Sequence, residues 1–241
     1  MPMEHNSFTF KGVNSLSYYV YVVSKNVYDA AERDITFQSI AGRSGDLLVD
    51  NGRFKNVQIK YDCVAIPRDK IQIDEKTRII KGWLQSETGY FALKDTFNQN
   101  FFRLACATGE IAFDEMYNGI AKGTINFNCK PYLYSIEGQK TVTLSEPDTI
   151  YNAFAFGSVP YLKIYGNGAG TLTINGTPFR ILNIDTYVEI EGETGDAMKD
   201  GIDCNSLVNY DYAPELIPGE NRIEWGGGIT KIEIIPRWRT L

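Results

Sequence analysis

The stretch Asn56–Ile66, NVQIKYDCVAI, decides the fold class because its apolar and polar residues alternate. Successive side chains of a β-strand point to opposite faces, so this period of two predicts a strand with one buried face. The segments GTINFNC and VPYLKIYG alternate in the same way, and several such strands make a mainly β protein. The predicted buried positions are Val57, Ile59, Tyr61, Cys63, Ala65, Ile125, Phe127, Cys129, Leu162 and Ile164.

One segment, Asp74–Gly89, has helical periodicity instead. Its apolar stripe predicts an amphipathic helix, with Asp74 as the N-cap and Gly89 near the end. Gly82 inside it costs about 1 kcal/mol relative to alanine, so packing of the tryptophan has to stabilise the helix. The stripe consists of Ile79, Ile80, Trp83 and Leu84.

The pattern changes after Pro131, and we place a domain boundary at Gly138, giving domains 1–138 and 139–241. The second domain is expected to contain short strands with tight turns, typical of a β-sandwich of ordinary size. Asn175-Gly176 between TLTI and TPFRILNI predicts a hairpin with a type I′ turn. The three glycines 226–228 between NRIEW and ITKIEII predict a second hairpin.

Composition excludes several functions. The 241 residues carry a net charge of −6, which argues against sequence-independent binding of nucleic acid, a process that needs clustered Lys and Arg. No apolar run is long enough for a membrane span, and the N-terminus lacks the apolar core of a signal peptide, so we expect synthesis in the cytoplasm. The cysteines are expected to be buried thiols rather than disulfides or zinc ligands; they are Cys63, Cys106, Cys129 and Cys204.

The glycine-rich stretch Ile40–Phe54, IAGRSGDLLVDNGRF, was tested against catalytic motifs. A nucleophile elbow needs glycine two residues after the serine, where Asp46 stands, and the chain's single histidine is His5. A phosphate-binding loop needs Lys where this segment carries acid. Glycines therefore indicate a turn here, with a second turn at Asp50–Gly52, and we expect no catalytic, cofactor-binding or metal residue in it.

Acidic and aromatic clusters have alternative interpretations. Carboxylates at Glu189, Glu191 and Glu193 would share one face of a strand and, with Asp196, could hold Ca²⁺, but a solvated acidic face is the favoured interpretation. Aromatic residues in NFNCKPYLYS and IYNAFAFGSVPYL could stack on sugars, although core and interface packing is favoured. Trp238 is expected to close the second domain while its neighbouring arginines point outward.

The order of several segments resembles the distal tail proteins of long-tailed, mostly non-contractile bacteriophages that infect Gram-positive bacteria. The segments are NSFTFKGVNSLSYYVYV, ERDITFQSIAGRSGDLLVDNGRFKNVQIKY, AKGTINFNCKPYLYS, PYLKIYGNGAGTLTING, LIPGENRIEWGG and IEIIPRWRTL.

The resemblance implies a ring-forming N-terminal β-sandwich domain with one helix and a β-hairpin, followed by a galectin-like or carbohydrate-module-like sandwich. Family members form hexameric rings at the tail tip. The ring docks on the tail tube, receives the tail-associated lysin or tip protein, and in many phages presents its C-terminal domains to receptor-binding proteins. About a hundred residues follow Gly138, which leaves no room for an inserted sugar-binding domain.

The expected function is therefore a virion structural hub that serves host attachment, assembled in the host cytoplasm and free of enzymatic activity, cofactor and metal. The alternative is a soluble carbohydrate-binding β-sandwich protein. Arg43 and Asp46 in the turn-rich segment are the candidate contact residues for a neighbouring subunit or partner.

Overall fold

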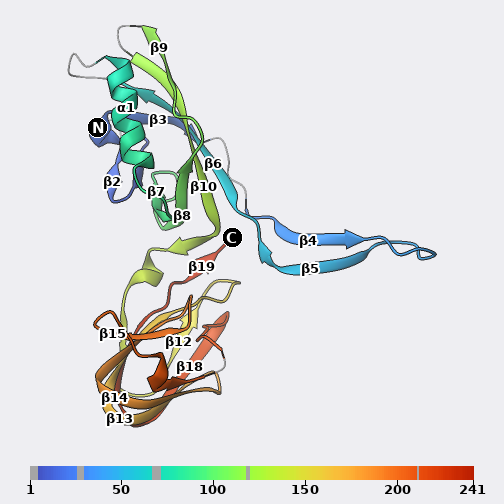
Figure 1. Ribbon diagram of the computed structural model, residues 1–241, viewed down its shortest axis with the longest axis vertical. Helices are drawn as coiled ribbons and strands as arrows, with labels where there is room; N and C mark the ends of the chain where they lie inside the picture. Colours follow the sequence, from blue (N-terminus) through green and yellow to red (C-terminus); the bar gives the residue numbers. More distant parts are fainter. Residues whose placement is uncertain (1–4, 26–29, 67–71, 118–119, 211) are drawn as a thin grey trace. The chain divides into compact units, whose positions relative to one another are not determined.

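The chain forms two compact units, each with its own hydrophobic core. The computed structural model in Figure 1 describes residues 5–25, 30–66, 72–117, 120–210 and 212–241. Unit 1 comprises Met1–Leu133 with Leu241, and unit 2 comprises Tyr134–Thr240. Within the described residues, no helix combines the length and the apolar character that crossing a membrane requires.

Unit 1 is organised around one sheet and one α-helix. Its elements are β1 (Phe8–Phe10), β2 (Val13–Asn14), the 3-10 helix η1 (Ser15–Tyr18), β3 (Val20–Lys25), β4 (Arg33–Gln38), β5 (Leu47–Phe54), β6 (Val57–Ala65), α1 (Ile73–Gln85), β7 (Phe91–Asp95), β8 (Phe101–Thr108), β9 (Phe113–Tyr117) and β10 (Ile120–Ser135). The sheet has the strand order β2-β1-β7-β8-β10-β6-β3, and β9 also pairs with β10. Strands β4 and β5 pair only with each other and form a separate two-stranded sheet.

The predicted alternation of β6 and β10 is confirmed. The two strands run antiparallel, with Val57 opposite Cys129 and Ala65 opposite Ala121. Their inward residues lie in the core beside Phe8 and Phe10 of β1, whereas the intervening residues are exposed or partly exposed. Burial of one face fixes the register, because a slip of one residue would turn the apolar side chains outward.

The predicted helix is confirmed, with corrections at its start and on its stripe. It begins at Ile73, with Gln72 in an extended conformation as the N-cap, so Asp74 lies in the first turn rather than at the cap. Ile80 and Leu84 are buried as expected, but Ile79 is 39% exposed. The face of the helix that packs on the sheet is therefore narrower than the predicted apolar stripe.

Packing of the helix tryptophan is confirmed. The Trp83 ring stacks on Tyr18, with centroids 4.7 Å apart, and on Phe8, with centroids 5.6 Å apart. Offset aromatic pairs of this kind add about 0.5–1.5 kcal/mol beyond their buried area, which offsets the cost of Gly82.

Unit 2 is built on a second sheet. Its elements are η2 (Glu137–Gln139), β11 (Val142–Leu144), β12 (Asp148–Asn152), β13 (Tyr161–Ile174), β14 (Thr177–Glu191), β15 (Asp196–Lys199), β16 (Ile202–Asp203), η3 (Asn205–Leu207), β17 (Val208–Asn209), β18 (Gly219–Ile235) and β19 (Arg239–Thr240). The strand order is β11-β18-β13-β14-β15-β16, with β12 on β18 and β17 on β14. The mainly β fold class is thus confirmed.

The expectation of short strands in the second half is wrong for its three central strands. β13, β14 and β18 contain 14, 15 and 17 residues. The glycines 226–228 lie inside β18 and do not form the predicted second hairpin. They permit close approach to β13: a Cβ on Gly228 would lie 1.9 Å from the Asn167 carbonyl oxygen, and one on Gly166 2.1 Å from the Gly228 oxygen. Glycine here marks bulges that let one strand continue, not a chain reversal.

The hairpin at Asn175-Gly176 is confirmed. Both residues have positive φ, 51° and 82°, as a type I′ turn requires, and they join β13 to β14. The side chain of Asn175 adds a further constraint, because its oxygen accepts from the Arg222 N–H of β18 at 2.9 Å.

Candidate functional site

The β4–β5 hairpin, residues 33–54, is the candidate functional site and is called the arm below. It projects away from the sheet of unit 1 as a two-stranded ribbon (Figure 1). Apart from Asp34, Ile35 and Phe54, which are partly buried, its residues are exposed. Isolated two-stranded hairpins are marginally stable in water, and both edges of this one carry unpaired backbone groups.

The tip of the arm contains the two residues predicted as contacts. Gly42 and Gly45 have φ of 77° and 86°, and the Arg43 N–H donates to the Ile40 carbonyl at 3.1 Å, so the predicted turn is confirmed. The side chains of Arg43 and Asp46 are both exposed there. Their role in contacts stays a prediction.

The second predicted turn, Asp50–Gly52, lies inside β5 and does not reverse the chain. The register shifts between Arg33 and Ile35, and Gly52 has a φ of 71° with its N–H donating to the Asp50 side chain. The motif therefore forms a bulge, since an Asx hydrogen bond and a positive φ serve a bulge as well as a turn.

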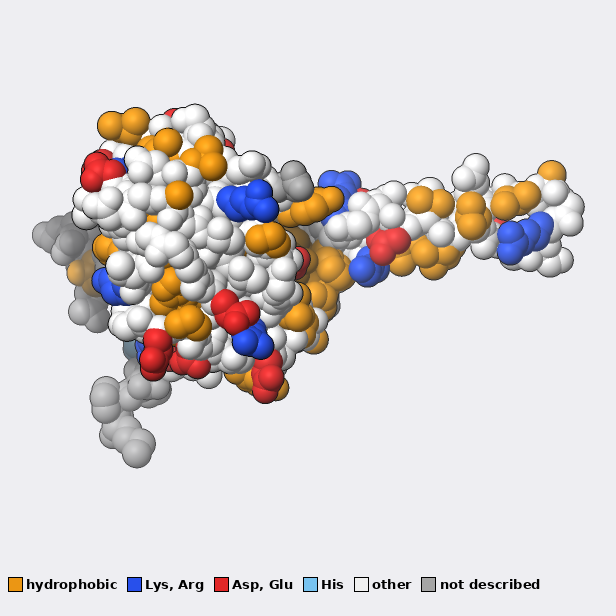
Figure 2. Space-filling model, turned by 90° about the horizontal axis from the view of Figure 1, so that it is seen from below, with side chains coloured by type: hydrophobic (Ala, Val, Ile, Leu, Met, Phe, Trp, Pro, Cys, Tyr) orange, Lys and Arg blue, Asp and Glu red, His pale blue; other side chains and the backbone are white. Residues whose placement is uncertain are grey.

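Large apolar side chains lie on both faces of the arm. Phe37 pairs with Leu48 on one face, and their exposed fractions are 65% and 55%. Leu47 and Val49 lie on the other face, opposite Gln38 and Thr36. Figure 2 shows hydrophobic side chains interspersed with charged ones along the arm. A ribbon that is apolar on both faces has no core of its own, which is typical of a surface covered by a partner.

Polar contacts strengthen the root of the arm. Asp34 accepts from the Arg53 Nε at 2.7 Å and from the Asn51 amide at 3.3 Å, and these hydrogen bonds lower the pKa of the Asp34 carboxyl. Phe54, the last residue of β5, packs on the core of unit 1, with Arg33 over its ring at 5.2 Å. The arm is therefore fixed at its root and free of internal packing farther out.

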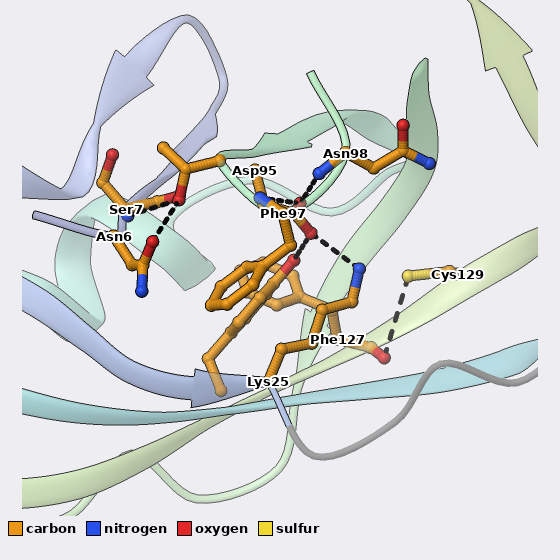
Figure 3. Close-up of polar contacts among 10 residues, drawn as sticks. Asn6, Ser7, Lys25, Asp95, Phe97, Asn98, Phe127 and Cys129 are labelled. Atoms are coloured by element: carbon orange, nitrogen blue, oxygen red, sulfur yellow. Dashed lines mark hydrogen bonds and ion pairs between the residues drawn. The ribbon is translucent and has the colours of Figure 1, made fainter. Parts of the chain in front are cut away.

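A second polar cluster surrounds Asp95 at the end of β7 (Figure 3). One carboxylate oxygen accepts from the Lys25 Nζ at 2.8 Å and from the Tyr61 hydroxyl at 2.6 Å. The other accepts from the backbone N–H groups of Phe97 and Asn98, each at 3.0 Å. Burial and the Asp95 carboxylate raise the pKa of Tyr61, so the phenol keeps its proton and donates it.

The Asp95 cluster lacks the room that a substrate needs. The adjoining hollow, which Arg103 and Leu93 also line, measures about 20 Å³, roughly the space of one water molecule. The cluster joins the ends of β3 and β7 to the middle of β6, so we interpret it as a structural brace of unit 1 rather than a reaction centre.

The candidate calcium carboxylates do not converge. Glu189 pairs with Lys163 at 3.0 Å, and Glu191 forms a bidentate pair with Arg237, so the interpretation as a solvated acidic face holds only for the exposed Glu193 and Asp196. Burial acts to raise the pKa of Glu191, but the hydrogen bonds from Arg237 and the Glu193 N–H lower it overall. Among the described residues, no group of three His, Cys, Asp or Glu side chains is placed to hold a metal ion.

The predictions for the C-terminal residues are partly corrected. Trp238 packs on the core of unit 2 as expected. Its neighbours do not point outward: Arg237 binds Glu191, and the Arg239 Nε donates to the Gly157 carbonyl at 2.5 Å. The two arginine side chains turn toward partly buried carboxylate and carbonyl acceptors, because hydrogen bonds from a guanidinium to such acceptors are stronger than those to water.

The aromatic and cysteine predictions have mixed outcomes. Tyr134 is buried and Tyr132 contacts Phe54, whereas Tyr151 is exposed. Cys63 and Cys129 are buried thiols as expected, and Cys106 and Cys204 are free but only partly buried.

The residues that sequence reasoning missed are the apolar side chains of the arm. The signal was present, since the run LLV follows a glycine-rich turn without the alternation of a half-buried strand.

Comparison with known proteins first defines the class. Residues 15–129 match the family model described as the phage tail protein RIFT-related domain. This match covers the arm and most of the sheet of unit 1. Comparison with curated proteins gives no match.

Solved structures extend the likeness to the whole chain. The SPP1 Dit protein, described as a paradigm of the hub adsorption apparatus in Gram-positive infecting phages, matches with a TM-score of 0.75 at 14% identity. The match covers 99% of this chain and 100% of that one. A chain of the phage P2 baseplate, described as in its activated conformation with Ca, matches with a TM-score of 0.56 at 11% identity, over 96% of this chain and 97% of that one.

The family model over residues 15–129 and the whole-length fold together agree with the expected resemblance to the distal tail, or baseplate hub, proteins of phages.

Proposed function

We propose that the protein is the hub at the tip of a phage tail, or of a prophage-encoded tail, and that it assembles into a hexameric ring. Residues 1–138 would form the ring, and residues 139–241 would be the C-terminal domain that contacts other tail components. The observation that carries the proposal is the arm, because it presents apolar side chains on both faces and has no internal core.

Closing a ring explains both unusual properties of the arm. A subunit that covers Phe37 and Leu48 would remove large apolar areas from water, at about 25 cal/mol per Å². A neighbouring strand that pairs with β4 or β5 would satisfy the backbone groups at a free edge. In a closed ring every subunit uses the same pair of surfaces, so six arms would be covered equally.

The expected partners are the last ring of the tail tube, the tail-associated lysin or tip protein, and a receptor-binding protein at the C-terminal domains. Arg43 and Asp46 at the arm's tip are the proposed polar contacts at its far end. The hub acts by assembly and has no enzymatic role. Fold similarity to the SPP1 and P2 chains supports this assignment by analogy.

The experiment is the absolute mass of the purified protein by light scattering, with negative-stain images of any large species. A particle of about six times the 27.1 kDa chain mass, with a central opening, supports the ring. A particle that persists when Phe37 and Leu48 are both replaced by serine contradicts the role of the arm. A strict monomer favours the alternative, a soluble carbohydrate-binding protein.

A further inference from the structure

An open groove lies in unit 2 beside the turn that joins β13 to β14. It consists of two hollows of about 340 Å³ and 250 Å³, both lined by Thr177, Phe179 and Tyr212. Binding sites for small molecules measure about 300–1,000 Å³, so the groove has the size of a ligand site. It belongs to neither the arm nor the Asp95 cluster.

Two tyrosines line the groove, one held by contacts and one exposed. Tyr210 is fixed, because its hydroxyl donates to the Gly195 carbonyl at 2.5 Å and its ring lies edge-on to Phe179 at 5.6 Å. Tyr212 is 78% exposed, and within the described part of the chain its side chain has no hydrogen bond or ring contact. The groove thus presents one open aromatic ring next to a rigid aromatic wall.

Three polar side chains in the groove also lack partners among the described residues. Arg180 and Asn209 line the first hollow, and Glu215 lines the second. A guanidinium, a carboxamide and a carboxylate together offer both donors and acceptors. Most charged residues of β13 and β14 have ion-pair partners in the same sheet, such as Lys163 with Glu189, so unpaired polar groups gathered in a hollow are distinctive.

The backbone of β14 is not available to a ligand at this position. Strand β17 pairs with it, with Asn209 opposite Arg180 and Val208 opposite Ile181. An extended peptide therefore has no free edge to join here. A ligand in the groove has to be recognised by side chains, through ring faces and hydrogen bonds.

We propose that this groove binds a saccharide. The apolar face of a sugar ring would stack on Tyr212, and its hydroxyl groups would exchange hydrogen bonds with Arg180, Asn209 and Glu215. Amphipathic tyrosine rings supply contact area, and the planar polar groups supply orientation. The proposal concerns unit 2 and holds whether or not the protein forms a ring.

The test uses the full-length protein and saturation-transfer NMR. The probes are the methyl glycosides of glucose, galactose, N-acetylglucosamine and rhamnose, together with maltotriose and chitotriose. Affinity of each sugar that binds is then measured for Tyr212→Ala and Arg180→Gln. The matched control is Tyr151→Ala, a tyrosine of β12 that is 66% exposed outside the groove.

We expect saturation transfer to at least one sugar and a loss of affinity of about tenfold in Tyr212→Ala, with no change in Tyr151→Ala. Arg180→Gln is expected to weaken binding as well. The proposal is overturned if no probe receives saturation at about 10 mM, or if Tyr212→Ala and Tyr151→Ala bind sugar with equal affinity.

Discussion

The arm and the β13–β14 hairpin are both antiparallel ribbons closed by glycine-containing turns, yet their apolar residues have opposite fates. In β13–β14, Leu162, Leu172 and Ile190 are fully buried in the core of unit 2. In the arm, Phe37 and Leu48 remain more than half exposed. The comparison teaches that similar local structure can have two outcomes: burial within the subunit stabilises the fold, whereas exposed apolar side chains leave a surface that, in our proposal, a neighbouring subunit covers.

The two ribbons should differ most in how much stability they lose when a leucine is replaced by alanine. Leu172→Ala should lower the free energy of unfolding by about 2–5 kcal/mol, because it leaves a cavity in a packed core. Leu48→Ala should change it by less than about 0.5 kcal/mol in the monomer, since the side chain is exposed already. Urea denaturation at a concentration that keeps the protein monomeric measures both. Equal losses would contradict the comparison.

The polar contacts of the Asp95 brace and of the arm's root should also differ in their contribution to stability, but by less. Tyr61→Phe removes a donor to the buried Asp95 carboxylate and should cost about 1.5–3 kcal/mol. Asp34→Asn at the arm root should cost clearly less than Tyr61→Phe, because water replaces the lost contact with Arg53. Thermal unfolding followed by circular dichroism tests the ranking, and a larger loss in Asp34→Asn would reverse our assignment of the brace.

The turn glycines of the two ribbons form a matched pair, because a substitution at either would introduce the same backbone strain. Gly176 and Gly42 have φ of 82° and 77°, and an added Cβ would meet no atom within 4 Å at either position. Alanine in the left-handed region costs about 1–2 kcal/mol. Gly176→Ala should lower global stability by that amount, whereas Gly42→Ala should not, because the arm's tip can open without unfolding the core. A global loss in both variants would show that the arm unfolds together with its unit.

The smallest expected effect concerns pH. The pKa of Glu191 is lowered in the folded protein, so its contribution to stability is present above its unfolded pKa, about 4.3, and is lost as pH falls through the folded value. Glu191→Gln should therefore reduce stability by about 0.5–1 kcal/mol at pH 7. The difference from the unmodified protein should shrink at about pH 3. Urea titrations at the two pH values check this, and a constant difference would exclude the Arg237 pairing as its cause.

Alternation and turn chemistry predicted the parts of the fold that depend on local sequence. They identified β6, β10, the helix and the Asn175-Gly176 turn, because a period of two, a helical stripe and an Asn-Gly pair each restrict the backbone directly. The glycines 226–228 were assigned wrongly, because close approach between β18 and β13 is a property of packing that one strand's sequence does not contain. The same limit applies to Arg237, whose partner Glu191 lies far away along the chain.

The candidate site was predicted in its position but not in its chemistry. The glycine-rich turn directed attention to Arg43 and Asp46, whereas the structure places the main apolar surface on the strands that flank this turn. Exposure of Phe37 and Leu48 could not be read from sequence, since a strand's apolar residues are normally buried by another layer.

The most direct test of the account is amide hydrogen exchange of residues 33–54, compared between the concentrated protein and a dilute monomeric sample. Our account predicts that arm amides exchange slowly in the assembled state and rapidly in the monomer, while β13 and β14 stay protected in both. Rapid exchange of the arm in an assembled ring would contradict the claim that the arm is the contact surface of the hub.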